Sequence, residues 1–343
     1  MKQAGLSLVE LMIALLLSTL LTLGIFTMYM DSTETSRVSR SLARVQESGR
    51  IALDIMAEDL RMLGFLGCSY PMQDVRPSFL ASDLVSDSDD EAFFASGIRG
   101  AVVGEEDWAD IVDDFGVGAL AANAVAGSDV FQLRYANGPG LALDQDMAAP
   151  GSVISTGSDE AVTRFRIGGN ALITNCATAD MFTVRDPDGF EDNEINHDEL
   201  STTYPEGSRV LQFRTITYWV GDTGRTDQNG NAIFALYQNG LEAVSGVERM
   251  QVLFGVRDGG QVSFLTADNI TDDEWSEIEA AQVGLLVSDE QAVLEEADAK
   301  QYVLPGLTVD PSGTAGAAAT YPADGRLRTT FTMTVKVRNQ IDQ

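Results

Sequence analysis

The stretch GLSLVELMIALLLSTLLTLGIFTMYM, residues 5–30, decides the fold. After Glu10 it contains twenty residues without a charge. At a rise of about 1.5 Å per residue they can cross a hydrocarbon core of about 30 Å. This run is longer than the apolar core of a signal peptide, about 7–15 residues, and Thr22-Leu23-Gly24 is a poor cleavage site. The sequence therefore predicts a membrane-spanning helix, and Lys2 favours a cytoplasmic N-terminus.

Glu10 stands at the edge of this apolar run. An unpaired carboxylate costs a few kcal/mol at such a position, so Glu10 requires a cation. Cleavage after Gly5 would create an amino group on Leu6, four residues from Glu10. A neighbouring copy of the helix could supply the same charge.

The segment GLSLVEL, residues 5–11, resembles the prepilin motif of type IV pilins. In that family a membrane peptidase cuts after the glycine and methylates the new N-terminus. The resemblance implies that Gly5 precedes the cut, that Leu6 is the methylated first residue, and that Glu10 pairs with a neighbour's terminus during assembly. Pilins usually carry phenylalanine or methionine at the position of Leu6, a departure that bears on methylation more than on cleavage.

The helix continues beyond Met30, because apolar residues recur at steps of three and four. We expect one long helix over residues 6–63, apolar in its first half and amphipathic in its second. Gly64 and Gly67 mark its end. The apolar stripe, which we expect to pack against a globular head, consists of Val38, Leu42, Val45, Ala52, Ile55, Met56, Leu60 and Leu63. Charged residues, Arg44 among them, largely occupy the other faces.

A second resemblance begins where this helix ends. Asp59-Leu60-Arg61 and Gly64-Phe65-Leu66-Gly67-Cys68 look like the corresponding segment of the PilW family of minor pilins. The order of elements from Tyr218-Trp219-Val220 to Arg338-Asn339 resembles that family too. The chain has two cysteines, Cys68 and Cys176, and for a domain outside the cytoplasm we predict that they form one disulfide. Two buried free thiols are the alternative.

After Cys68, short alternating segments predict a β-rich head. Asn229-Gly230 is a hairpin signal. The insertions around residues 74–128 and 289–323 look poorly constrained. Strands are expected at residues 129–135, 161–167, 180–184, 209–220, 232–238, 247–256, 281–288 and 327–338.

The expected fold class is α+β and type IV pilin-like, with the long N-terminal helix packed on the β-rich globular head. We divide the chain into five parts. These are the prepilin leader (1–5), the transmembrane and assembly half of the helix (6–30), its amphipathic half (31–67), a variable loop and strand region (68–206) and a C-terminal sheet region (207–343).

Composition argues against several functions. The chain has 52 acidic against 22 basic residues, and its net charge of −30 repels phosphate backbones, so we expect no nucleic-acid partner. The single histidine, His197, has no serine in a Gly-x-Ser-x-Gly elbow to accompany it, so we expect no catalytic residue, enzyme activity or cofactor. Residues 186–194 and a patch around Asp222 and Asp227 offer oxygen ligands for calcium. Solvated loops are the favoured interpretation, so we expect no metal.

Together the resemblances imply a minor pilin of the type IV pilus. It would wait in the inner membrane with a periplasmic head, then prime assembly and lie in the pilus tip, supporting adhesion and twitching motility. The implied partners are the prepilin peptidase, the inner-membrane assembly platform, the major pilin, other minor pilins and a tip adhesin. A head of about 280 residues favours a cap over a shaft position on steric grounds.

Three alternatives stay open. The closest is a J-type minor pseudopilin of a type II secretion system, which shares the N-terminal motif and a large β-rich head. The others are a membrane-anchored periplasmic enzyme and an adhesin that binds a surface directly through its acidic loops, within residues 83–128.

Overall fold

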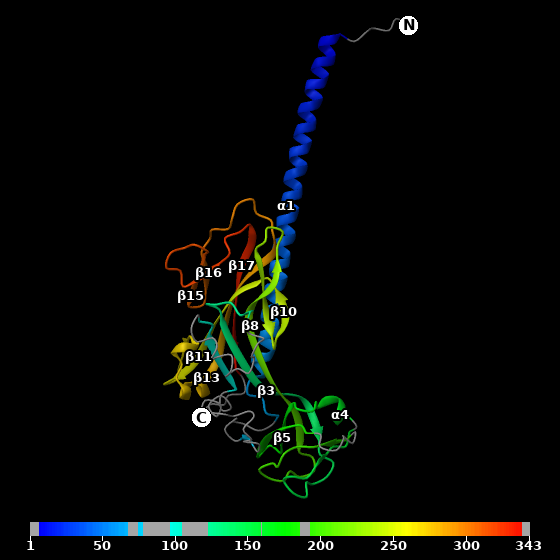
Figure 1. Cartoon of the computed structure of the whole chain (residues 1–343), viewed down its shortest axis with the longest axis vertical. Coiled ribbons are helices and arrows are strands. Elements are labelled where there is room, and N and C mark those ends of the chain that lie inside the picture. The colour runs from blue at the N-terminus through cyan, green and yellow to red at the C-terminus, as the bar shows by residue number, and fades with distance from the viewer. Residues whose placement is uncertain are drawn as a thin grey trace, which may run out of the picture.

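The long helix α1 (Leu8–Met62) extends far beyond the rest of the molecule (Figure 1). The computed structural model describes residues 7–67, 75–77, 97–104, 123–158, 160–185 and 193–337. The helix ends as predicted, because Leu63 is no longer helical and Gly64 adopts φ 71°, a left-handed conformation that favours glycine. The predicted class, one long apolar helix followed by a β-rich head, is confirmed.

An eight-stranded sheet forms the larger part of the described head. Its strands are β1 (Val75–Pro77), β2 (Ile98–Val102), β3 (Asp129–Ala142), β5 (Asn170–Thr174), β6 (Ala179–Thr183), β8 (Arg209–Thr226), β9 (Ala232–Gln238) and β10 (Leu241–Ser245). Their order is β1-β6-β5-β8-β3-β2, while β9 pairs with β8 and with β10.

A four-stranded sheet covers the second half of α1. In the order β12-β11-β13-β17, it consists of β12 (Gln261–Leu265), β11 (Val247–Asp258), β13 (Ile278–Ala292) and β17 (Arg326–Lys336). Two small sheets complete the described strands: β14 (Tyr302–Leu304), β15 (Leu307–Pro311) and β16 (Ala319–Tyr321) in one, and β4 (Ile154–Ser155) and β7 (Glu194–Ile195) in the other. The short helices among the described residues are α4 (Ala161–Arg164), η3 (Ala267–Asn269) and η4 (Asp272–Glu277).

Two expectations about the head were wrong. Residues 161–167 hold helix α4 instead of a strand, because the buried Ala161 and Phe165 lie four residues apart, a spacing that also fits one helical turn. The insertion at residues 289–323 contributes the ordered sheet of β14, β15 and β16, whose strands of three to five residues are too short to show clear alternation.

The long strands β3 and β8 connect two apolar cores. Phe131 and Tyr218 lie in the core that packs on α1, whereas Ala136 and Val210 of the same strands lie in a second core. We call the region around this second core the distal lobe: α4, β4 to β7 and the adjoining ends of β3 and β8. Figure 1 shows it at the end of the head farthest from the N-terminus.

Small residues let the second half of α1 approach the four-stranded sheet closely. Ser41, Val45, Gly49 and Ala52 are buried, and a Cβ at Gly49 would overlap the Phe331 ring of β17. Leu42, which the predicted stripe included, is 39% exposed. The buried face is therefore rotated toward the small residues, which the apolar pattern did not reveal.

Candidate functional site

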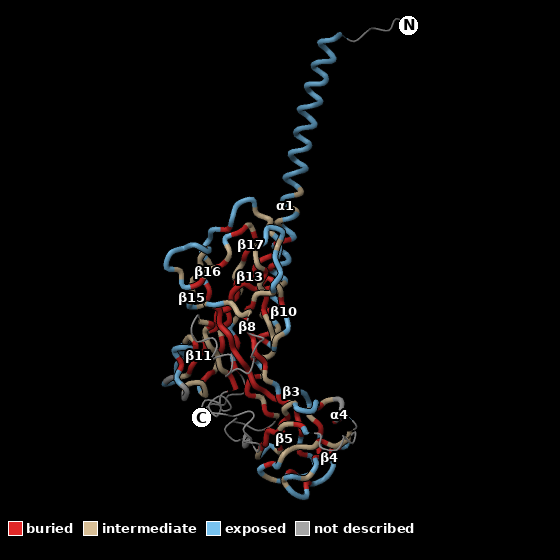
Figure 2. Tube along the Cα trace, viewed as in Figure 1, coloured by how far each residue is buried: buried red, intermediate tan, exposed pale blue. Residues whose placement is uncertain are grey.

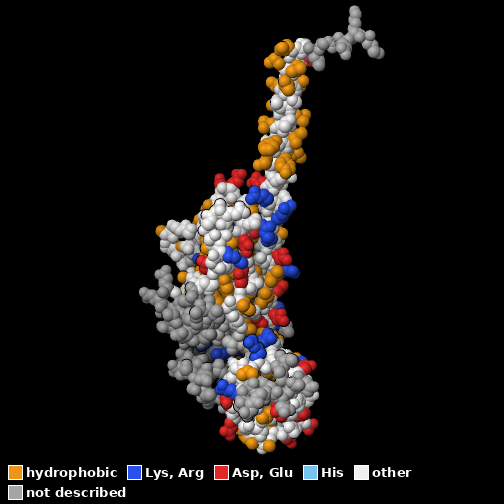
Figure 3. Space-filling model, turned by 45° about the vertical axis from the view of Figure 1, so that its right-hand side comes forward, with side chains coloured by type: hydrophobic (Ala, Val, Ile, Leu, Met, Phe, Trp, Pro, Cys, Tyr) orange, Lys and Arg blue, Asp and Glu red, His pale blue; other side chains and the backbone are white. Residues whose placement is uncertain are grey.

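The first half of α1 is exposed along its whole length (Figure 2). Its large apolar side chains, from Leu8 to Met30, are at least half exposed, and Figure 3 shows them along the free part of the helix. Within the described residues it is the one helix long and apolar enough to cross a membrane. The hydroxyls of Ser18, Thr19 and Thr22 donate to backbone carbonyls three or four residues earlier. These three hydroxyls can therefore face lipid or other apolar helices without being left unpaired.

Glu10 lies in the first turn of α1 and is exposed. No described residue forms an ion pair with it. Gly5 and Leu6 lie outside the described residues, so cleavage, methylation and the role of Glu10 stay predictions.

Cys176 adopts φ 71° in a tight turn, in which the side-chain oxygen of Asn175 accepts from the backbone amides of Ala177 and Thr178. Cys68 lies outside the described residues, and the predicted disulfide stays a prediction. The residue before it, Gly67, packs against the end of β5, since a Cβ there would stand 3.1 Å from Cγ2 of Thr174.

Asp59 fastens α1 to three strands of the larger sheet. Its carboxylate accepts hydrogen bonds from the hydroxyl of Tyr135 on β3 at 2.5 Å, from the hydroxyl of Tyr218 on β8, and from the amide of Gln238 on β9 at 2.9 Å. Burial, reinforced by the bond to Asp59, raises the pKa of both tyrosine hydroxyls, so they remain donors. In the sequence, Asp59 stands out only as part of a family motif, and no local signal indicates this role.

Arg44 makes a second attachment between α1 and the head. Its guanidinium donates to the buried Asp289 of β13 at 2.5 Å and 3.1 Å, and these hydrogen bonds raise the pKa of Arg44. Arg44 was expected on a face of the helix other than the apolar stripe. It is half exposed, but its partner is buried. The two-pronged contact is typical of an arginine with a carboxylate.

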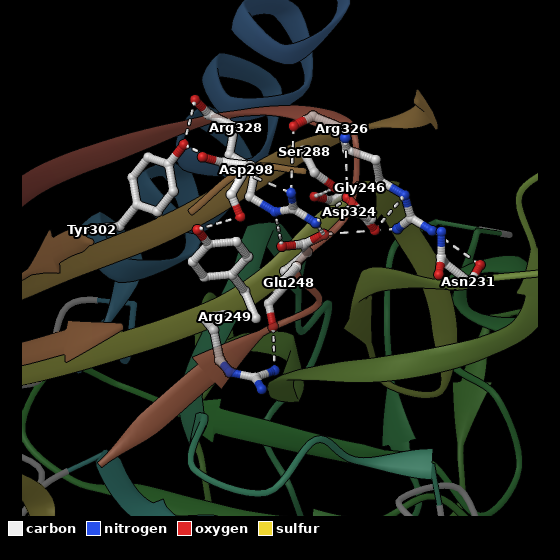
Figure 4. A network of polar contacts seen from close by, with 12 residues as sticks. Asn231, Gly246, Glu248, Arg249, Ser288, Asp298, Tyr302, Asp324, Arg326 and Arg328 are labelled. Atoms are coloured by element: carbon white, nitrogen blue, oxygen red, sulfur yellow. Dashed lines mark hydrogen bonds and ion pairs between the residues drawn. The ribbon is translucent and has the colours of Figure 1, made fainter. Parts of the chain in front are cut away.

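A buried network of charges joins the start of β17 to β11 and the small sheet (Figure 4). Arg328 donates to both oxygens of Glu248, at 2.7 and 3.0 Å, and to Asp324 at 2.8 Å. Its guanidinium also lies 4.6 Å from the centre of the Tyr321 ring on β16. The network comprises Arg249, Arg326, Arg328, Asp227, Glu248, Asp298 and Asp324.

Asp227, one of the two aspartates noted as possible calcium ligands, belongs to this network. Its carboxylate accepts from the backbone amides of Asn229 and Asn231, the Asn231 side chain and Arg326. Burial alone would raise its pKa, but these donors outweigh burial and hold the pKa at about 2. The oxygens of Asp227 therefore already face hydrogen-bond donors and a guanidinium.

The described residues contain no group of three or more His, Cys, Asp or Glu side chains that could hold a metal ion. Most of the other candidate loop, residues 186–192, lies outside them. The ring nitrogens of His197 face the backbone oxygens of Ser152 at 2.9 Å and Asp198 at 2.5 Å. Both ring nitrogens are thus held by backbone oxygens, and the ring centre lies 5.3 Å from that of Phe182.

Two family models match the chain. The one described as the prokaryotic N-terminal methylation motif matches residues 1–26, and the one described as type IV pilus-assembly protein W matches residues 223–339. Among solved structures, a type IV-like pilin from Thermus thermophilus is 19% identical over 38% of this chain and 69% of its own length. Its TM-score of 0.22 is too low to carry an argument. No curated protein matches the chain significantly.

The methylation motif, the exposed apolar helix and the β-rich head make the chain similar to the class of type IV pilins. Within this class, the match that runs from the end of β8 through β17 is to PilW, so the family resemblance drawn from the sequence motifs is confirmed.

Proposed function

We propose that the protein is a non-enzymatic minor pilin that primes assembly of the type IV pilus and remains in the tip complex, where it supports adhesion and twitching motility. The prepilin peptidase cuts after Gly5 and methylates Leu6. The observation that carries this proposal is the wholly exposed apolar half of α1 with Glu10 in its first turn. Such a surface requires apolar neighbours, first lipid and then other pilin helices, and Glu10 requires a cation from one of them.

The distal lobe supports a position at the cap. It lies at the end of the head opposite the N-terminus of α1 (Figure 1). With that terminus in the cytoplasm, the lobe points away from the inner membrane and along the growing pilus. A further pilin stacked on the tip side of this subunit would collide with the distal lobe. This favours a position at the tip, beside other minor pilins, with the major pilin on the membrane side and a tip adhesin on the outer side.

The mass of the N-terminal peptide from protein recovered from cells tests processing. We expect a peptide that begins at Leu6, with or without one methyl group. A peptide that begins at Met1, or after about residue 24, would remove the pilin interpretation.

Glu10→Gln tests assembly separately from processing. We expect the variant to be cleaved normally but lost from sheared pili, because Gln cannot neutralise an amino terminus. Glu34→Gln, an exposed change beyond the apolar half, is the matched control and should assemble.

Immunogold labelling of intact pili tests the position of the protein. Label at the pilus ends supports a position at the cap, and label along the shaft contradicts it.

A further inference from the structure

A hollow of about 250 Å³ opens on the distal lobe, between the end of α4, the start of β5 and the first half of β8. Arg164, Arg166 and Arg214 line it, together with Asn170 and Gln212. We call it the arginine hollow. Basic side chains are visible near the junction of the distal lobe and the rest of the head in Figure 3.

The charge of this hollow is opposite to that of the whole chain. Only 22 of the 343 residues are Lys or Arg, yet three arginines line this one concavity and none of the described residues that line it is acidic. Arg164 pairs with Glu160 at 2.6 Å on the surface. Arg166 and Arg214 are exposed, and neither forms an ion pair with a described carboxylate. A concave surface of one sign concentrates its field on ions of the other sign.

The surroundings of the arginines suit an oxyanion. The side-chain amide of Gln212 donates to the backbone oxygen of Arg164, which fixes the end of α4 against β8. Asn170 accepts the Thr183 hydroxyl on its amide oxygen, so its amide nitrogen is a further donor. The buried rings of Phe165 and Phe213 back the hollow, and apolar walls strengthen charge interactions beside them. Guanidinium groups bind carboxylate, sulfate and phosphate through paired N–H groups.

We propose that the arginine hollow binds an oxyanion, either as a free ion or as a carboxylate presented by a protein partner. The inference does not depend on the role in the pilus. It assigns to the distal lobe a recognition site that the assembly helix does not provide.

Equilibrium dialysis of the full chain in detergent against radiolabelled sulfate, at low ionic strength, tests the site. We expect saturable binding of one sulfate per chain. Arg166→Gln with Arg214→Gln should weaken binding about fivefold or more, the loss expected for two exposed charge contacts. Arg40→Gln with Arg50→Gln removes the same charge from exposed positions of α1 and is the matched control. All four arginines are exposed, and equal thermal midpoints would verify that the variants fold.

Competition distinguishes the two sources. Displacement of sulfate by a glutamate-rich hexapeptide at concentrations where acetate fails would identify a protein carboxylate as the ligand. Displacement of sulfate by phosphate but not by the hexapeptide would identify a free anion as the ligand. Absence of saturable sulfate binding, or an equal loss in both double variants, would overturn the proposal, because the arginines would then act only through net charge.

Discussion

Asp59 of α1 accepts a 2.5 Å hydrogen bond from the hydroxyl of Tyr135, a residue of β3 that lies 76 positions later in the chain. The same carboxylate accepts from Tyr218 and Gln238 on the next two strands of the sheet. One side chain thus holds the last turns of the helix on the sheet, while the apolar half extends free.

Replacing Asp59 by alanine should therefore destabilise the head. The change leaves two tyrosine hydroxyls without their acceptor and removes one of the two acceptors of the Gln238 amide, and we expect a loss of about 2–4 kcal/mol in the free energy of unfolding. Urea denaturation of the full chain in detergent measures it. Asp54→Ala, on an exposed position of the same helix, should change stability by less than about 0.5 kcal/mol. Equal values for the two variants would show that the Asp59 contacts add nothing.

Gly49→Ala should destabilise the protein although alanine is the better helix former by about 1 kcal/mol. The added Cβ would overlap the Phe331 ring, and such overpacking costs about 1–3 kcal/mol. Gly24→Ala is the control, since nothing lies within 4 Å of a Cβ there. In a double-mutant cycle, Phe331→Ala should make Gly49→Ala neutral or stabilising. If Gly49→Ala raises the thermal midpoint in the wild-type background, the close approach of helix and strand is wrong.

The helix could be predicted from sequence because its signals are local. An uncharged run, a repeat of three and four residues and glycines at the end all lie within the segment itself. Strand β9 was predicted at its observed bounds for the same reason. The helix α4 was not predicted, because the spacing of Ala161 and Phe165 fits a helical turn as well as a strand. Tertiary packing decides between the two.

Local sequence signals could not identify the charged residues that attach α1 to the head or that pair with one another inside the head. Arg44 and its partner Asp289 are 245 residues apart, and Arg328 and Glu248 are 80 apart. No periodic pattern connects such pairs, and an arginine on the polar face of a helix is expected in solvent by default. Glu10 was noticed because its chemistry conflicts with its immediate neighbours, a signal that needs no tertiary structure.

In the buried network around Glu248 and Arg328, removing an arginine should lower the free energy of unfolding more than removing a carboxylate. The network holds three arginines and four carboxylates, so removing an arginine increases the excess of negative charge. Arg328→Gln should cost about 3–5 kcal/mol, and Glu248→Gln should cost less. Thermal denaturation of the two variants gives the order directly. The reverse order would mean that an unpaired Arg328 costs more than unpaired carboxylates.

Asp129 should make stability fall as pH rises. Burial raises its pKa to about 7, because desolvation outweighs the hydrogen bonds from the Val252 amide and the Gln251 side chain. Its second oxygen is buried without a hydrogen bond. The folded state therefore holds a proton that the unfolded state releases near pH 4, and its stabilising contribution is lost between about pH 4 and pH 7.

Asp129→Asn should remove this part of the pH dependence. At pH 8 we expect the variant to be more stable than the wild type by up to about 4 kcal/mol, at 1.36 kcal/mol per pKa unit. At pH 4 the difference should largely disappear, because Asp129 is then protonated in the folded protein. Urea midpoints across pH 4–8 check the slope. A parallel shift at all pH values would instead indicate a change in packing.

Cys68 and Cys176 should form a disulfide in protein isolated from cells. Gly67 leads into Cys68, and its contacts with Thr174 and Leu211 bring the chain to the turn that holds Cys176. Closing a loop of about a hundred residues stabilises the folded state by up to about 4–5 kcal/mol on the chain-entropy model. Alkylation of the denatured protein without reductant should modify neither cysteine, and reduction should expose both. Cys68→Ser with Cys176→Ser should lower the thermal midpoint to that of the reduced wild type. Two alkylated cysteines before reduction would show that the thiols are free, and the end of α1 would then be held on the distal lobe by packing and by the hydrogen bond from the Ala136 amide to the Phe65 oxygen.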